Sequence, residues 1–379
     1  MPFSKLNLTP PIEQALKENA YTKPTPIQEK VIPLMLELHD IMARAQTGSG
    51  KTASFVLPLL KLWSDDIKEG KPKIQALILT PTRELTLQVS KSFDAMSQFM
   101  PKKPKVVTLI GGEHIGEQLL EIQKGCDIVV ATSGRLLDII NKKQINLSHL
   151  NFFILDEADK MLDLGFAEEL DSILEVIPKK RQNLLFSATY PEKMRKIAEK
   201  ITQNPIEVSI NEEQPTVENI KQRAIQVDKE NRGPLLRHLI ETNSWQLILV
   251  FMANKRACDN IAAKFRKYGI EADSFHGDLE QDERNYTLED FKAKKFQVLF
   301  ATDIAARGLH IDDIDCIVNF DLPRSPLDYI HRIGRTARAG KNGEALSFIT
   351  HENSEHFKLI QKRSQIKLNI EQIEGFEST

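Results

Sequence analysis

The sequence predicts an α/β protein made of two tandem parallel-sheet domains joined by a short linker. Short apolar segments of strand-like composition alternate with longer helical segments, and this alternation runs through the chain twice. Such alternation is typical of a parallel sheet with helices on both faces. A polar segment containing two prolines separates the two series. The length of 379 residues also suits two domains of ordinary size.

Each expected strand is short and apolar, as in a sheet that is buried on both faces. In the first half the expected strands are residues 40–44, 75–80, 106–110, 127–132, 152–155 and 183–186. Helical stretches between them include residues 52–62, 83–100 and 113–124. In the second half the expected strands are residues 246–251, 272–275, 297–301, 316–320 and 345–349. No short-period repeat is evident, so the recurrence is one of architecture.

The break between the halves is expected near residues 204–219, where Pro205 and Pro215 flank a polar, acidic stretch. Few residues there could anchor a core, which suits a linker. We therefore expect an N-terminal domain over residues 1–208, a linker over 209–218 and a C-terminal domain over 219–379.

The overall charge limits how the protein could bind nucleic acid. The formal net charge is −2, whereas proteins that coat duplex nucleic acid by charge alone are usually strongly basic. Any binding of nucleic acid must then come from a local groove, and it should weaken as salt rises.

Cysteine usage and hydropathy indicate a cytoplasmic location. Cys126, Cys258 and Cys316 are far apart and lack the spacing of a metal site or a disulfide framework. They are expected to be small buried residues in a reducing compartment. No apolar run approaches the length of a membrane span, and the N-terminus has no basic-then-apolar signal region.

Residues 45–52, with the sequence Ala-Gln-Thr-Gly-Ser-Gly-Lys-Thr, have the features of a phosphate-binding loop. Glycines let the chain curl and point successive N–H groups inward, and a following helix adds its positive N-terminal end. Lys51 would reach the β- and γ-phosphates, and Thr52 would place its hydroxyl on magnesium. Because Ala45 stands where the usual pattern has Gly, the alternative is an ordinary turn before a helix. The residues expected to cradle the nucleotide are Ala45, Gln46, Thr47, Gly48, Ser49, Gly50, Lys51 and Thr52.

Two acids, Asp156 and Glu157, follow the apolar strand at residues 152–155. An apolar strand that ends in two carboxylates is costly unless a metal or a reaction uses the charge. Asp156 would hold magnesium, and Glu157 would orient and deprotonate an attacking water. The alternative is a helix whose first turn carries acids that favour its dipole. Together with the phosphate loop, these acids predict a site for a nucleoside triphosphate and Mg²⁺.

Nearly every expected strand is followed at once by a polar cluster. Because ligands bind at the carboxyl ends of the strands in open parallel sheets, we expect these clusters to lie at functional edges. The clusters are residues 80–84, 111–112, 132–135, 156–159, 187–189, 276–278, 302–303 and 307–308. Two such edges could face one another across a cleft that closes on a ligand.

From residue 3 to about residue 347 the chain resembles the DEAD-box family of ATP-dependent RNA helicases, in superfamily two. The Asp-Glu-Ala-Asp quartet at 156–159 gives that family its name, and the motifs occur in the family's order. Residues 21–28 resemble its adenine-recognition motif. The resemblance implies two RecA-like domains. It also implies that Gln28 reads the adenine edge, with Tyr21 in the same motif and the ring of Phe3 near the base. For Gln28, the alternative is a solvated helix residue.

The resemblance also assigns residues that would couple the two domains. Ser187 and Thr189 would link the ATP site to domain closure, and His331 would lie near the catalytic water. Arg335 and Arg338 would act as arginine fingers on the γ-phosphate, where guanidinium groups stabilise the transferring phosphoryl charge. Asp303 and Arg307 would bridge the domains. From spacing alone, Arg332, Arg335 and Arg338 could instead form a solvated basic stripe on a helix.

RNA is expected to lie across both domains, held by its backbone and therefore with little sequence preference. The positions that match the family's RNA contacts are Pro81, Thr82, Arg83, Gly112, Thr132, Arg135, Gly277 and Thr302. Five positions depart from the family pattern. Ala20 and Ala337 replace usual glycines, Thr86 a usual Ala, Ser133 a usual Pro and His310 a usual Asp that is expected to contact the ribose.

The leading expectation is an RNA-dependent ATPase that locally unwinds short RNA duplexes and remodels RNA or RNA–protein complexes, with hydrolysis in the cleft between its domains. It would use ATP and Mg²⁺ and act as a monomeric core. One alternative is an ATP-dependent RNA clamp with little unwinding. Another is a DNA translocase of the same superfamily, against which the adenine motif and the acidic quartet argue.

Overall fold

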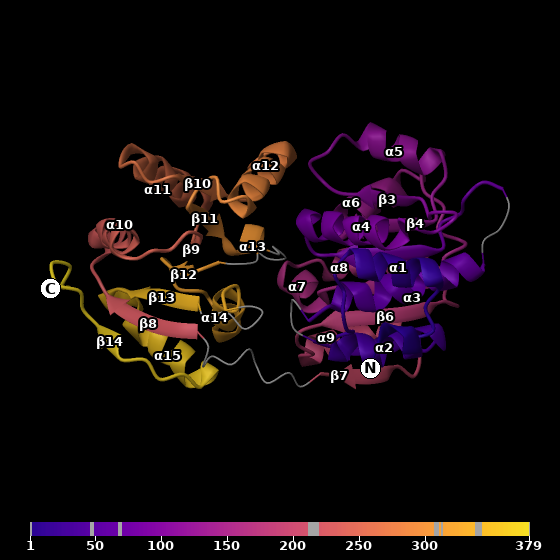
Figure 1. Cartoon of the computed structure of the whole chain (residues 1–379), viewed down its shortest axis with the longest axis horizontal. Helices are drawn as coiled ribbons and strands as arrows, with labels where there is room; N and C mark the ends of the chain where they lie inside the picture. The colour runs from indigo at the N-terminus through magenta and orange to yellow at the C-terminus, as the bar shows by residue number, and fades with distance from the viewer. Residues whose placement is uncertain are drawn as a thin grey trace. The chain divides into compact units, whose positions relative to one another are not determined.

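The computed structural model describes residues 2–45, 49–66, 70–210, 220–306, 311, 314–337 and 343–378. The chain divides into two compact units, Met1–Glu212 and Glu213–Thr379, each containing one parallel sheet with helices on both faces (Figure 1). This confirms the predicted α/β class. The boundaries predicted for a linker at 209–218 stay a prediction, because residues 211–218 lie outside the described part.

The sheet of the first unit has the strand order β3-β4-β2-β5-β6-β1-β7, and all its neighbours are parallel. Its strands are β1 (Ile41–Arg44), β2 (Ala76–Thr80), β3 (Val106–Leu109), β4 (Ile128–Thr132), β5 (Phe152–Leu155), β6 (Gln182–Ser187) and β7 (Ile206–Ser209). Its helices are α1 (Pro10–Glu18), α2 (Pro26–Leu36), α3 (Lys51–Asp65), α4 (Arg83–Ser97), α5 (Ile115–Gln123), α6 (Ser133–Asn141), α7 (Ala158–Asp163), α8 (Ala167–Val176) and α9 (Glu192–Ile201).

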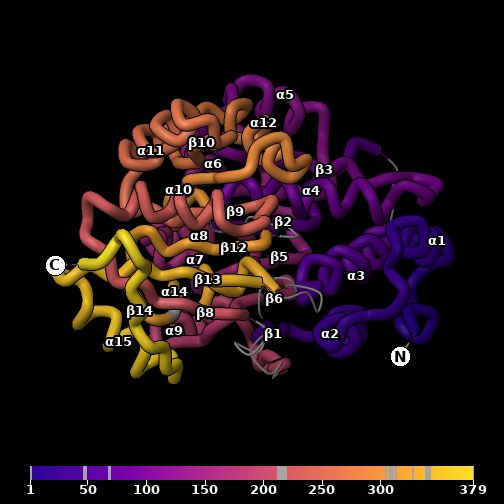
Figure 2. Tube along the Cα trace, turned by 60° about the vertical axis from the view of Figure 1, so that its left-hand side comes forward, coloured from indigo at the N-terminus to yellow at the C-terminus, as the bar shows by residue number. Residues whose placement is uncertain are grey.

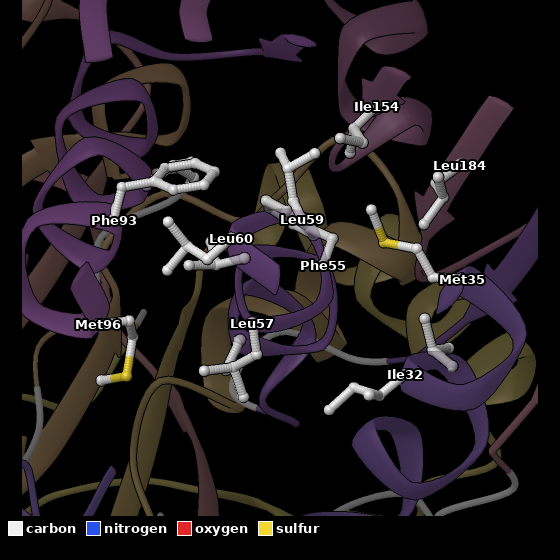
Figure 3. Close-up of a cluster of buried hydrophobic side chains, with 14 of the residues drawn as sticks. Ile32, Met35, Phe55, Leu57, Leu59, Leu60, Phe93, Met96, Ile154 and Leu184 are labelled. Carbon is white, nitrogen blue, oxygen red and sulfur yellow. The ribbon is translucent and has the colours of Figure 1, made fainter. Parts of the chain in front are cut away.

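Alternate residues of these strands enter two hydrophobic cores, because successive side chains of a strand point to opposite faces. Helices α1 to α4 cover one face, where α3 lies between α2 and α4 and sends Phe55 and Leu59 toward the sheet residues Ile154 and Leu184 (Figure 3). Helices α6 to α9 cover the other face, against residues such as Phe153 and the rest of the second core. This packing fixes α3, and with it the residues at its N-terminus, over the middle of the sheet.

The second unit repeats the strand order of the first, as β10-β11-β9-β12-β13-β8-β14, again with parallel neighbours. Strands β9, β12, β13 and β8 can be followed side by side in Figure 2. The strands are β8 (Ile220–Gln226), β9 (Ile248–Met252), β10 (Ala272–Phe275), β11 (Val298–Thr302), β12 (Cys316–Asn319), β13 (Gly343–Ile349) and β14 (Ile370–Glu371). The helices are α10 (Arg232–Thr242), α11 (Lys255–Lys267), α12 (Gln281–Lys292), α13 (Asp303–Ala306), α14 (Pro326–Ile333) and α15 (Ser354–Ser364).

Three strands were not expected from the sequence: β7, β8 and β14. Residues 206–209, which the sequence places at the start of the break, pair with β1 as β7, and Val208 is buried in the core. The two units therefore resemble each other more than the sequence predicted, because both sheets place their strands in the same order.

The three cysteines are buried and unpaired, as predicted. Burial raises the pKa of Cys126 and of Cys258 to about 12, and it raises the pKa of Cys316 well above its usual range. Among the described helices, none combines the length and the apolar character that a bilayer crossing needs.

Candidate nucleotide and nucleic-acid site

The parallel strands bring the predicted polar clusters to one edge of each sheet. In the first unit β5, β6 and β1 are neighbours, so the segments that follow them lie side by side. The backbone N–H of Ala45, after β1, donates to the carbonyl of Ser187 at the end of β6 at 3.1 Å. The phosphate loop, the acidic quartet and the 187–189 segment therefore share this edge.

The end of the phosphate loop requires glycine at position 50. Gly50 is the N-cap of α3 and has φ +89°, a left-handed conformation that glycine adopts without strain. A Cβ there would come within 2.5 Å of the Gln28 amide nitrogen and 2.9 Å of the Thr25 hydroxyl oxygen. Lys51 begins the helix and is buried, with Thr52 next to it. Gln46, Thr47 and Gly48 lie outside the described residues.

Gln28 ties the adenine-motif segment to this loop. Its Oε1 accepts from the backbone N–H of Thr25 at 3.0 Å, and its Nε2 donates to the Gly50 carbonyl at 3.1 Å. The side chain is 1% exposed, which excludes the alternative of a solvated helix residue. Phe3 and Tyr21 pack edge to face with ring centroids 6.4 Å apart, Phe3 buried and Tyr21 exposed.

Asp156 lies buried beside Lys51. Burial raises the pKa of the Asp156 carboxyl to about 6, the Lys51 ammonium opposes this rise, and the Glu157 carboxylate adds to it. The backbone N–H of Glu157 donates to Oδ1 of Asp156 at 2.9 Å. The structure thus brings the phosphate-loop lysine and the first acid of the quartet within electrostatic reach of each other.

Glu157 is paired with Lys160, a residue that the sequence reasoning missed. Nζ of Lys160 lies 2.7 Å from Oε2 of Glu157, and both side chains are almost fully buried. Glu157 also has φ +51°, a conformation that non-glycine residues adopt uncommonly and that recurs at functional sites. The available signal was the i, i+3 spacing of an acid and a base at the start of a helix.

Asp159 connects the quartet to the segment at 187–189. Its Oδ2 accepts hydrogen bonds from the backbone N–H groups of Ala188 and Thr189, at 3.2 and 3.0 Å, and from the Thr189 hydroxyl at 3.1 Å. Ser187 donates its hydroxyl to the Thr189 carbonyl at 2.5 Å. The sequence placed Asp159 in the motif without a role; in the structure it binds Ala188 and Thr189 directly, and Ser187 is joined to it through Thr189.

The predicted RNA contacts of the first unit gather at the ends of β2, β3 and β4, which are neighbours in the sheet. The Arg83 guanidinium lies against Gly112, where φ is +84° and a Cβ would come within 2.2 Å of Nη1. Arg135 donates from Nη2 to the Glu113 carbonyl at 3.0 Å. Thr132 donates to the Leu109 carbonyl at 3.4 Å. Pro81 and Thr82 precede α4, and Thr82 caps this helix by accepting from the Leu85 N–H.

Two departures from the family pattern are compensated locally. The Thr86 hydroxyl lies 2.6 Å from the Thr80 hydroxyl and donates to the Thr82 carbonyl at 3.0 Å. Ser133 donates a short hydrogen bond to the carboxylate of Glu169 on α8. Both polar groups are therefore satisfied inside the fold.

Two further departures carry strain, because Ala20 and Ala337 have φ values of +59° and +56°, in the region that favours glycine. The fifth departure, His310, lies outside the described residues.

In the second unit Arg332 is the organising cation. Its Nε and Nη2 donate to the two carboxylate oxygens of Asp303, and its Nη1 donates to Oδ1 of Asn319 and to the Asp321 carbonyl. Arg332 and Arg335 are both buried, and α14 ends before Arg335. The alternative of a solvated basic stripe is therefore wrong for these two residues. Arg307 and Arg338 lie outside the described part of the chain.

The remaining predicted residues of the second unit lie at the ends of two strands and on one helix. Gly277 follows β10 and Thr302 ends β11, and these strands are neighbours. A Cβ at Gly277 would meet no atom within 4 Å, so space alone does not require glycine there. His331 lies on α14, next to Arg332.

The DEAD-box ATP-dependent RNA helicase CshA of Bacillus subtilis (strain 168) is 40% identical to this chain over 367 residues, which span 97% of this chain and 73% of that protein. The chain belongs to the DEAD/DEAH box helicase family. The family profile matches residues 25–197 of this DEAD-box protein, and that of the helicase conserved C-terminal domain matches residues 232–340. CshA of Geobacillus kaustophilus is 37% identical over 97% of the chain and 77% of that protein.

A solved structure of Saccharomyces cerevisiae Dbp5 bound to RNA and ADP BeF3 matches the DEAD-box chain with a TM-score of 0.86. It is 30% identical, and the match covers 98% of this chain and 95% of that one. The likeness confirms the expected pair of RecA-like domains.

Proposed function

We propose that the chain is an RNA-dependent ATPase that locally unwinds short RNA duplexes and remodels RNA or RNA–protein complexes. The observation that carries the proposal is the placement of Lys51 and the buried Asp156 within electrostatic reach at one sheet edge. The family membership supports it, since CshA is named as an ATP-dependent RNA helicase and Dbp5 was solved with RNA and a nucleotide. The clamp and DNA-translocase alternatives have no comparable support.

ATP would be held by the loop at residues 45–52, with Lys51 on its β- and γ-phosphates. Mg²⁺ fits the donors present, because it prefers oxygen ligands and usually takes one or two from protein, with phosphates and water completing the shell. Thr52 supplies a hydroxyl and Asp156 a carboxylate. When bound, the ion would neutralise charge on the phosphates. Gln28, seated against Gly50, is proposed to read the adenine edge, with Phe3 and Tyr21 near the base.

Glu157 is proposed to accept a proton from the attacking water, since a carboxylate is an effective general base when held in place. Arg335 and Arg338 are proposed to stabilise charge on the γ-phosphate, with His331 near the water. Ser187 and Thr189 are proposed to transmit the state of the nucleotide, while Asp303 and Arg307 join the units. Backbone-directed contacts to RNA are assigned to Arg83, Gly112, Thr132, Arg135, Gly277 and Thr302, together with Pro81 and Thr82. Cytoplasmic location and a monomeric core stay predictions.

Steady-state ATP hydrolysis with and without single-stranded RNA tests the proposal. RNA should stimulate turnover, and DNA of the same sequence should not; stimulation by DNA alone would favour the translocase. Separation of a short RNA duplex in the same conditions distinguishes a helicase from a clamp. Lys51→Ala should weaken nucleotide binding, because it removes a cation from the phosphate cradle. Absence of RNA-stimulated turnover in the folded protein would contradict the proposal.

A further inference from the structure

The buried pair of Glu157 and Lys160 has a consequence for the proposed reaction. An ammonium 2.7 Å from Oε2 of Glu157 occupies an oxygen to which a water proton would otherwise be transferred. Both side chains are at most 5% exposed, so bulk water does not screen this contact as it would a surface pair. One oxygen of the proposed general base is therefore engaged by a cation of the same helix turn.

The same turn is tied to the segment at residues 187–189. Oδ1 of Asp159 accepts from the backbone N–H of Lys160 at 3.1 Å, while Oδ2 of Asp159 accepts three hydrogen bonds from Ala188 and Thr189. A single buried carboxylate thus holds Lys160 on one side and the 187–189 segment on the other. A shift of that segment would be passed through Asp159 to the backbone that carries Lys160.

We propose that Lys160 is a positioning residue that restrains Glu157 and suppresses hydrolysis until the 187–189 segment shifts. The inference rests on the proposed function, because it requires Glu157 to be the general base. Displacement of the ammonium exposes a carboxylate oxygen to the attacking water, which then gives its proton to Glu157 as its oxygen bonds to the γ-phosphorus. The bond between that phosphorus and the bridging oxygen breaks in the same reaction, and ADP leaves with the electron pair. RNA stimulation of ATP hydrolysis consists in part of this release.

The test compares Lys160→Gln with Lys160→Arg. The amide keeps a hydrogen-bond donor and removes the charge, whereas the guanidinium keeps the charge. Lys160→Gln should raise kcat without RNA by about three- to tenfold, because it removes the charge that lies 2.7 Å from Oε2 of Glu157 and keeps a neutral side chain in its place. KM for ATP and kcat at saturating RNA should change by less than about twofold, because the phosphate cradle is untouched. Lys160→Arg should keep the low RNA-independent rate of the parent.

A matched control is Lys358→Gln, which removes the lysine of an exposed i, i+3 pair with Glu355 and should leave both rates unchanged. Thermal unfolding and fluorescent ATP-analogue binding confirm that each variant is folded. Combining Lys160→Gln with Thr189→Val tests the connection through Asp159. Thr189→Val should lower RNA stimulation in the parent, and it should lower it less once the ammonium has been removed.

The outcomes separate this inference from the proposed function. If Lys160→Gln is folded and binds nucleotide, but its RNA-independent kcat is unchanged or lower, the restraint by Lys160 is overturned. An equal rise in kcat for Lys160→Arg would also overturn it. If instead Glu157→Gln still hydrolyses ATP within a few-fold of the parent, the role of Glu157 fails, and the proposed mechanism fails with it.

Discussion

Arg332 and Asp303 form a two-bond ion pair within the second unit, with Nε donating to Oδ1 and Nη2 donating to Oδ2, each at 2.6 Å. Arg332 also stacks over the ring of Phe251, 4.7 Å from its centroid. This cation therefore fixes the carboxylate that begins α13, at the end of β11. Asp303, which is proposed to join the two units, is thus held in place by Arg332, for which the sequence indicated no partner.

Arg332→Lys should destabilise the second unit and lower RNA-stimulated ATP hydrolysis. An ammonium cannot reproduce the planar pair of donors. Because Asp303 is 29% exposed and a cation is retained, the loss should be smaller than the loss of about 3–5 kcal/mol that follows breaking a fully buried pair. Thermal unfolding and ATPase assays well below the unfolding midpoint measure the two effects separately. Arg266→Lys is the control, because its ion pair with Asp273 is half exposed. Equal unfolding midpoints for the two variants would contradict the structural role of Arg332.

Gln28→Ala should weaken ATP binding about tenfold and reduce the preference for ATP over GTP. The substitution removes the proposed adenine reader together with the bond to the Gly50 carbonyl, and hydrogen bonds of this kind contribute about 1 kcal/mol each. Fluorescence titration with labelled ATP and GTP gives both affinities. Thr25→Ala is the control variant. It removes another side chain that lies next to Gly50 but leaves the Gln28 carboxamide in place. The adenine role fails if the parent uses GTP as well as ATP.

Ala20→Gly should stabilise the first unit. An L-residue with φ near +59° pays roughly 1 kcal/mol relative to glycine, so the unfolding midpoint should rise by a few degrees. Ala95→Gly, in the interior of α4, should have the opposite effect, because glycine costs about 1 kcal/mol in a helix. Differential scanning calorimetry compares the two, and a lower midpoint for Ala20→Gly would refute the strain at this position.

Asp156→Asn should change how stability depends on pH in the absence of nucleotide and metal. The pKa of Asp156 is raised to about 6 from 3.8, so the folded state holds this proton more tightly than the unfolded chain. Its contribution to stability is present below pH 3.8 and is lost as pH rises through about 6. The unfolding midpoint of the variant, relative to that of the parent, should therefore rise between pH 4 and pH 7, because only the parent loses this contribution. A constant difference across this range would exclude the raised pKa.

Most of the strands that were predicted consist of continuous apolar residues, because burial on both faces leaves a plain signal in sequence. Strand β8 was missed because its polar side chains find partners on neighbouring segments. Lys221 pairs with Glu344 at 2.6 Å, and Arg223 pairs with Glu371 at 2.6 Å. The sequence does not show that these charges pair with carboxylates far along the chain. The charged residues of β8 therefore suggested a loop instead of a strand.

The residue types of the site were predictable because parallel strands collect their following loops at one edge. The partners were not. Asp159 meets Thr189 across 30 residues and Arg332 meets Asp303 across 29, and both contacts depend on strand order. Lys160 was overlooked for another reason, since an acid and a base three apart on a helix usually form a surface pair of little consequence.

The two units have the same strand order, so the segments that follow equivalent strands can be compared directly. Asp156 follows β5, and Asp321 comes shortly after β12, the strand at the same place in the other sheet. Asp321 accepts from Arg232 at 2.7 Å and from the Ala253 N–H at 2.8 Å, so it anchors two loops. Equivalent edges of the two sheets therefore carry an acid each, and in the second unit both carboxylate oxygens of that acid are used to hold neighbouring segments together.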